Sequence, residues 1–129
     1  MLAVDTNVVV RLLTVDEPRQ AARARTAFAR ETIFLPKTVL LETEWVLRRL
    51  YGFDQKQIAA AFTALIALKN VRCEDLTAVT TALKWLSAGM DFADALHVAS
   101  SGLAQRFGTF DANLVKRAKK HATPEVVAI

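Results

Sequence analysis

The chain has few of the residues that cross-link, interrupt or terminate local structure. Its 129 residues include one cysteine, three prolines and four glycines. The single Cys73 cannot form a disulfide within the chain, and no Cys/His spacing typical of a metal site is present, so we expect a reducing compartment, the cytoplasm. With no linker, repeat or low-complexity segment, we expect residues 1–129 to form one domain.

Long apolar runs and several well-known catalytic motifs are also missing. No stretch approaches the ~18 apolar residues of a membrane span, and Asp5 and Arg11 break the first apolar run before a signal-peptide core forms. We therefore expect a soluble protein that is neither exported nor membrane-bound. Without a glycine-rich phosphate loop, a nucleophile elbow or a zincin motif, nucleoside-triphosphate and acyl-transfer chemistry lose their usual sequence support.

Apolar residues and positive charge are what the chain has in excess. Hydrophobic residues make up 53% of the sequence, more than a monomer of this size usually needs, which favours a homodimer or a tight partner. The net charge is +4, and setting aside five acids discussed below leaves eight acidic residues against 17 basic ones. A basic surface around an acidic site suits a polyanion such as RNA, although basic side chains can also simply keep helix faces solvated.

Short β-like runs alternate with helical patterns along the whole chain. Strands are predicted at residues 2–4, 32–35, 71–73, 107–109 and 126–128, and helices at 8–13, 16–30, 38–50, from 54 onward, 76–89, 91–105 and 112–120. Asp16 is expected to cap the second helix, and Asp54 with Gln57 has the spacing of a capping box. This alternation predicts an α/β fold with a parallel sheet of four or five strands flanked by helices, and the helix pair around residues 38–66 resembles a protruding hairpin.

Five carboxylates stand where these elements begin, end or turn their buried side. They are Asp5, Glu42, Asp91, Asp94 and Asp111. Like charges avoid one another unless a cation joins them, and carboxylate oxygens are the ligands of hard divalent metals. Because ligands in parallel α/β folds bind beyond the carboxyl ends of the strands, these acids predict a metal site suited to phosphodiester chemistry.

Some of these acids also have a purely structural interpretation. Asp5 and Asp111 each precede a predicted helix, where either could act as an N-cap; for Asp111 the two roles are compatible, because one oxygen can cap while the other meets a metal or water. Thr6 and Asn7 are candidates to cap the same helix or to support the Asp5 carboxylate. Asn113 is a candidate contact to water or phosphate.

On the helix at 38–50, Glu42 is expected to be the functional acid and Glu44 a partner of Arg48. Glu44 has Arg48 four residues later, the favourable spacing for a surface ion pair, whereas no base lies one turn from Glu42. Glu42 is therefore expected on an apolar face that needs a cation or a solvent cleft, the alternative being partial exposure at the helix edge.

The helix at 91–105 carries one polar stripe, which is expected to face water, a metal or a buried network. Its members are Asp91, Asp94, His97 and Ser101, on an otherwise apolar pattern. His97 is expected to be a hydrogen-bonding neighbour rather than a ligand or base. Four basic residues near the last predicted helix are candidates to touch RNA phosphates, or are merely solvated: Lys116, Arg117, Lys119 and Lys120.

The chain resembles the PIN-domain ribonucleases, and more narrowly the VapC-type toxins of type II toxin–antitoxin pairs. The resemblance rests on VDTN near the start, LLETEWVL, DFADALHVAS and GTFDANLVKRA, in that order. It implies Mg²⁺ or Mn²⁺ held by Asp5, Glu42 and Asp94, with Asp111 as the fourth acid. Asp91 is an additional candidate acid, and Thr109 is implied as a polar neighbour.

The implied activity is metal-dependent endonucleolytic cleavage of RNA by an activated water, in a homodimer inhibited by a small cognate antitoxin. The alternatives are a PIN nuclease without an antitoxin, a haloacid dehalogenase-like phosphatase, and a binding module that has lost activity. The phosphatase usually needs a second acid two residues after the first, where this chain has Asn7, and an inactive module would have lost carboxylates that are all present here.

Overall fold

The computed structural model describes residues 1–121 and 123–129, which form two compact units, 1–76 and 77–129. We describe each unit by itself. Within the described chain, no helix combines the length and apolar character needed to cross a bilayer. The chain is α/β throughout, and every strand pairing is parallel.

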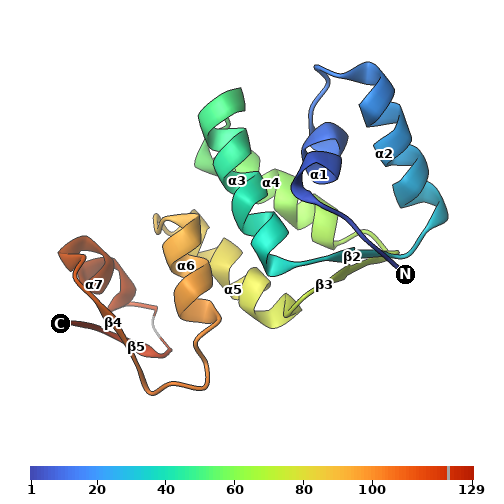
Figure 1. Cartoon of the computed structure of the whole chain (residues 1–129). Helices are drawn as coiled ribbons and strands as arrows, with labels where there is room; N and C mark the ends of the chain where they lie inside the picture. The colour runs from blue at the N-terminus through green and yellow to red at the C-terminus, as the bar shows by residue number, and fades with distance from the viewer. Residues whose placement is uncertain (122) are drawn as a thin grey trace. The chain divides into compact units, whose positions relative to one another are not determined.

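Unit 1 is a three-stranded parallel sheet with four helices (Figure 1). Along the chain its elements are β1 (Leu2–Ala3), α1 (Thr6–Leu13), α2 (Pro18–Arg30), β2 (Ile33–Leu35), α3 (Lys37–Tyr51), α4 (Gln55–Ile66) and β3 (Val71–Cys73). The strand order is β1-β2-β3, with Leu2 opposite Ile33 and Ile33 opposite Val71. Each parallel step needs a crossover, which α1 and α2 provide between β1 and β2, and α3 and α4 between β2 and β3.

The core of unit 1 is formed by side chains of α1, β2, α3 and α4. Val9, Ile33, Leu40, Leu47 and Phe62 are fully buried. Helix α1 packs against α2 and α3, and α4 packs against β3 (Figure 1). This packing fixes α1 and α3 side by side at the carboxyl ends of β1 and β2, the position that the sequence predicts for the site.

The described residues of unit 2 form a two-stranded parallel sheet and three helices. Its elements are α5 (Leu76–Ser87), which starts at the boundary, α6 (Phe92–Ala99), β4 (Arg106–Thr109), α7 (Ala112–Ala118) and β5 (Glu125–Ala128). Arg106 lies opposite Glu125 and Thr109 opposite Ala128, and α7 packs against both strands. Val79, Leu86, Phe92 and Val98 are among its buried side chains.

The five predicted strands are all present, and among the described residues they form a sheet of three and a sheet of two. The prediction of an α/β fold with parallel strands is therefore confirmed, although the described strands form two sheets rather than one sheet of four or five. Helices α3 and α4 are consecutive and joined by residues 52–54, with Gly52 in the left-handed conformation (φ 68°) that ends α3. That this helix pair protrudes as a hairpin stays a prediction.

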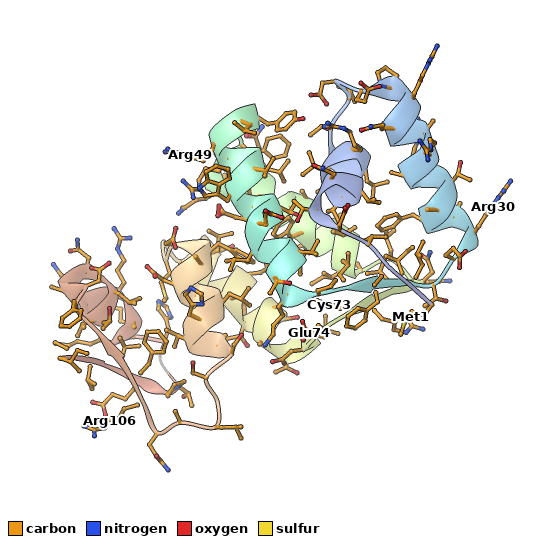
Figure 2. The ribbon with its side chains drawn as sticks, in the orientation of Figure 1. Met1, Arg30, Arg49, Cys73, Glu74 and Arg106 are labelled. Atoms are coloured by element: carbon orange, nitrogen blue, oxygen red, sulfur yellow. The ribbon has the colours of Figure 1, made fainter. Side chains whose placement is uncertain are left out.

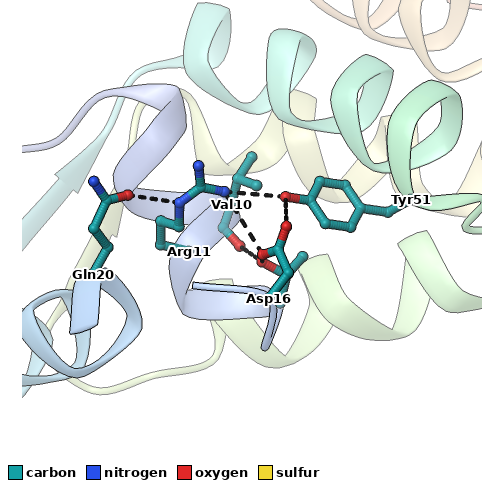
Figure 3. A network of polar contacts seen from close by, with 6 residues as sticks. Val10, Arg11, Asp16, Gln20 and Tyr51 are labelled. Atoms are coloured by element: carbon teal, nitrogen blue, oxygen red, sulfur yellow. Dashed lines mark hydrogen bonds and ion pairs between the residues drawn. The ribbon is translucent and has the colours of Figure 1, made fainter. Parts of the chain in front are cut away.

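Two sequence predictions about helix ends are wrong. The helix predicted at 91–105 ends at Ala99, because the Ser101 hydroxyl donates to the His97 carbonyl at 2.7 Å and Gly102 follows; Leu103 then lies in solvent. Asp16 does not cap α2, since the helix begins at Pro18 with Glu17 at the cap position and no side-chain cap. The Asp16 carboxylate is instead bound to other side chains (Figure 3).

Figure 3 shows the polar network that replaces this cap. The Tyr51 hydroxyl donates to Asp16 Oδ2 at 2.7 Å and accepts from Arg11 Nη1 at 3.0 Å, while Arg11 Nε donates to Gln20 at 2.7 Å. Thr14 also donates to Asp16 at 3.1 Å. These bonds hold the pKa of Asp16 below its usual value, with the Tyr51 hydroxyl as the largest cause. The network thus ties the loop after α1 to the end of α3.

Candidate active site

Asp5 lies at the start of α1, immediately beyond the carboxyl end of β1. Its Oδ1 accepts a hydrogen bond from the backbone N–H of Val8 at 3.2 Å, so Asp5 is the N-cap of α1. The residue is exposed, and the cap bond uses Oδ1. The structural interpretation of Asp5 is therefore confirmed, and it leaves the acid at the solvent edge where a ligand can approach.

Thr6 follows Asp5 in the sequence and is hydrogen-bonded to Glu42. This threonine is only 8% exposed, and its hydroxyl donates a hydrogen bond to Glu42 Oε1 of α3. The sequence predicts that Thr6 caps the helix or supports Asp5, and the structure gives Glu42 as its partner, because α1 packs against α3. A carboxylate 36 positions away is thereby oriented by the residue that follows Asp5.

The surroundings of the two glutamates on α3 differ from the prediction. Glu42 is exposed, as the alternative reading allowed, rather than seated on a buried face. Glu44 is the buried acid, 4% exposed, and its Oε2 lies 2.9 Å from Arg48 Nε. The ion pair is confirmed, but it is not a surface pair, because α3 turns residue 44 rather than 42 toward the interior. Glu42 keeps a solvent-facing carboxylate.

In unit 2, Asp91 and Asp94 lie together at the start of α6. Asp91 is the N-cap, and its Oδ2 accepts from the backbone N–H of Asp94 at 3.1 Å. Partial burial raises the pKa of Asp94, and the charges of Asp91 and Asp111 raise it further, while His97 and Arg117 act in the opposite direction. Two other carboxylates of unit 2 therefore act on Asp94.

Asp111 caps α7, and its own backbone N–H is hydrogen-bonded to Thr109. Its Oδ1 accepts from the backbone N–H groups of Asn113 and Leu114 at 2.9 and 3.2 Å, and its own N–H donates to the Thr109 hydroxyl at 3.0 Å. Thr109 is thus the polar neighbour of Asp111 that the sequence motif suggests. The cap bonds use a single oxygen, Oδ1, so capping and ligand binding remain compatible.

Other predicted residues take up more peripheral positions. His97 is exposed on α6 and acts on Asp94 through its charge. Asn7 lines a cavity of about 320 Å³ formed by β1, α1 and α2, together with apolar side chains and the arginines Arg11 and Arg23. No carboxylate is among the described residues that line this cavity.

Basic side chains cover both units. Figure 2 shows Arg30 and Arg49 of unit 1 extending away from the ribbon. In unit 2, four basic residues are exposed: Lys116, Arg117, Lys119 and Lys120.

The Cys73 thiol has a pKa raised to about 11, first by burial and then by the charges of Glu74 and Asp75. It is therefore protonated at neutral pH and is not a nucleophile.

The acids thus occur as two groups: Asp5 with Glu42 through Thr6, and Asp91 with Asp94 and Asp111. Among residues 1–121 and 123–129, no three histidine, cysteine or carboxylate side chains lie close enough to hold a metal together. The donor chemistry of each group nevertheless fits a hard divalent cation, because the groups are oxygen-only and the crowding of charge at Asp94 is relieved by a cation. Convergence of Asp5, Glu42, Asp94 and Asp111 on one ion stays a prediction.

Comparison with known proteins identifies the family. The sequence profile of the PIN domain matches residues 2–120, nearly the whole chain. The chain therefore belongs to the PIN-domain family. No curated protein matches it. Among solved structures, it is similar to VapC20 of Mycobacterium tuberculosis, a sarcin-ricin loop cleaving toxin, with 24% sequence identity, coverage of 90% of this chain and 94% of that chain, and a TM-score of 0.45.

Proposed function

We propose that this protein is a metal-dependent endoribonuclease and the toxin component of a type II toxin–antitoxin pair. We further propose that residues 1–129 act as one PIN domain and that Asp5, Glu42, Asp94 and Asp111 hold Mg²⁺ or Mn²⁺. The observation that carries the proposal is the match to the PIN family over residues 2–120, and it is supported by Asp94, whose pKa is raised by burial and by the charges of Asp91 and Asp111. The toxin assignment rests on the four acidic motifs and their order.

The side chains of the two groups have distinct parts in this function. Thr6 orients the Glu42 carboxylate, and the Thr109 hydroxyl with the backbone of α7 orients Asp111. A divalent ion supplies a Lewis acid for the phosphodiester and lowers the pKa of water. Asp111 would orient the attacking water or a second ion. His97 modulates the charge at Asp94 and takes no proton in the reaction.

The nucleophile in this scheme is water, and the ribose 2′-hydroxyl is not used. Cleavage should therefore leave 5′-phosphate and 3′-hydroxyl ends, whereas a histidine-driven reaction through the 2′-hydroxyl leaves a cyclic phosphate. The test is to incubate the purified chain with RNA and determine the ends. Activity should disappear with EDTA and return with Mg²⁺ or Mn²⁺. Cyclic phosphate ends, or full activity in EDTA, would overturn the mechanism.

Matched variants separate catalysis from folding. Asp94→Asn should abolish cleavage, while His97→Ala should retain most of it. The control is Asp54→Asn, because Asp54 caps α4 and asparagine caps a helix about as well as aspartate. If Asp54→Asn and Asp94→Asn lose activity equally, the loss reflects folding and the site assignment fails.

The partners are part of the proposal. A small antitoxin should suppress the toxicity of the expressed chain, and an antitoxin reading frame directly upstream of the gene is the first candidate to co-express. We also propose a homodimer acting in the cytoplasm, supported by the apolar excess and by Trp45 and Leu50 of α3, which are 50% and 70% exposed. Growth arrest that persists with every adjacent small reading frame would favour a PIN nuclease without an antitoxin.

A further inference from the structure

Unit 2 contains a second polar feature beside its acids, a basic cavity between the end of α5 and α7. Its volume is about 370 Å³, within the range of ligand pockets. The residues that line it are Ala88, Asn113, Lys116, Arg117, Lys120 and His121. We call this feature the basic cavity.

The charged side chains that line the basic cavity are all basic. Lys116, Arg117 and Lys120 contribute positive charge, while Asn113 and His121 add polar groups. No acid is among its described lining residues. Like charges placed within one concavity repel one another, so an anion bound among them is favoured over the empty state. Lys119 belongs to the same basic run and is exposed, but it does not line the cavity.

Two residues join the basic cavity to the acidic group of unit 2. Arg117 Nη1 donates to the Gly89 carbonyl at 3.1 Å, two residues before Asp91. The backbone N–H of Asn113 donates to Asp111 Oδ1 at 2.9 Å. An anion in the cavity is therefore held near the acidic group of unit 2.

We propose that the basic cavity holds a phosphate of the RNA strand that neighbours the phosphate being cleaved. This inference rests on the proposed nuclease function. An RNA strand carries a phosphate at every nucleotide, so a strand whose scissile phosphate lies at the acids brings another phosphate alongside them. An acidic protein segment contains no phosphodiester for the proposed nuclease to act on, which is why RNA is the occupant that we infer.

The experiment measures RNA binding by fluorescence anisotropy, with Asp94→Asn as the background so that no cleavage occurs. Lys116→Ala and Lys120→Ala should each weaken binding on the order of fivefold, the scale of one exposed ion pair. Each should also reduce the slope of log affinity against log salt by about 0.7, the value for one phosphate contact to a single strand. Lys119→Ala, the matched control, should leave affinity and slope nearly unchanged.

A modified RNA identifies the group that is bound. Replacing the phosphate next to the cleaved one by a neutral methylphosphonate should weaken binding to the Asp94→Asn protein, and adding Lys120→Ala should then cost little more. Independent, fully additive losses would overturn the inference, as would equal losses for Lys119→Ala and Lys120→Ala. Lysine variants that lose antitoxin binding and keep RNA binding would also overturn it.

The outcomes distinguish this inference from the proposed function. If the wild-type chain cleaves RNA and the cavity variants behave like Lys119→Ala, the nuclease stands and the phosphate site fails. If the cavity variants lose RNA affinity as expected but the wild-type chain cuts no RNA with any divalent ion, the basic cavity binds an RNA phosphate, whereas the nuclease fails and with it the position of that phosphate next to a cleaved one.

Discussion

Glu42 and Glu44 lie two positions apart on α3, and their replacement should have opposite effects. Glu42 is exposed and accepts a hydrogen bond from Thr6. Glu42→Gln keeps an oxygen acceptor for Thr6, so the free energy of unfolding should fall by less than about 1 kcal/mol, the size of one hydrogen bond. RNA cleavage should fall at least ~100-fold, because even residues that only support a metal ligand contribute up to that factor.

The Glu44–Arg48 pair should instead affect stability. Glu44 is 4% exposed, while the Arg48 side chain is 42% exposed. Arg48→Ala leaves a buried carboxylate without this partner; a broken buried pair costs roughly 3–5 kcal/mol, and partial solvation of Arg48 reduces our expectation to about 2 kcal/mol. For a chain of this size that lowers Tm by roughly 6–10 °C. Glu44→Gln should cost less, because the arginine left behind is already partly in water.

Thermal unfolding and cleavage of a fluorescent RNA at 20 °C separate the two effects. Glu42→Gln should unfold near the wild-type temperature and be inactive, while Arg48→Ala should unfold earlier and cleave at nearly the wild-type rate per folded molecule. An active Glu42→Gln protein together with an inactive, fully stable Glu44→Gln protein would show that the acids have been assigned in the wrong order.

Two further predictions follow from the pKa directions. Burial and nearby acids raise the pKa of Asp94 in the folded chain. The ionised carboxylate therefore destabilises the metal-free fold at pH values above that raised pKa, and this effect is absent below the ordinary value of about 4. Asp94→Asn should thus be as stable as wild type or more so at pH 7, and the difference should vanish toward pH 4. Thermal unfolding across pH checks this, and Mg²⁺ should raise Tm in wild type more than in the variant. Tyr51→Phe removes the largest cause of the lowered pKa of Asp16, so that pKa should rise toward its usual value in an NMR titration, and an unchanged value would contradict the network in Figure 3.

Local chemistry made much of the fold predictable. The strand at 71–73 has the predicted bounds, and both bonds of the capping box at Asp54 and Gln57 are present. These features depend on residues within one turn or one short strand, where spacing alone states which groups can meet. The same reasoning failed at Ser101, where a side chain bonded back to the helix carbonyl and ended a periodic pattern early.

The sequence by itself also determined which acids are candidates and in what order they occur, since motif spacing is a property of the chain. Only the tertiary structure decided their neighbours: Glu42 is oriented by Thr6, Asp94 is affected by Asp111, and Lys120 but not Lys119 joins the basic cavity. Hydrogen bonds and charge interactions depend on distance in space. That distance is set by how the helices pack on the sheet. It cannot be derived from sequence spacing when the two residues are 17 positions apart, as Asp94 and Asp111 are, or 36 positions apart, as Thr6 and Glu42 are.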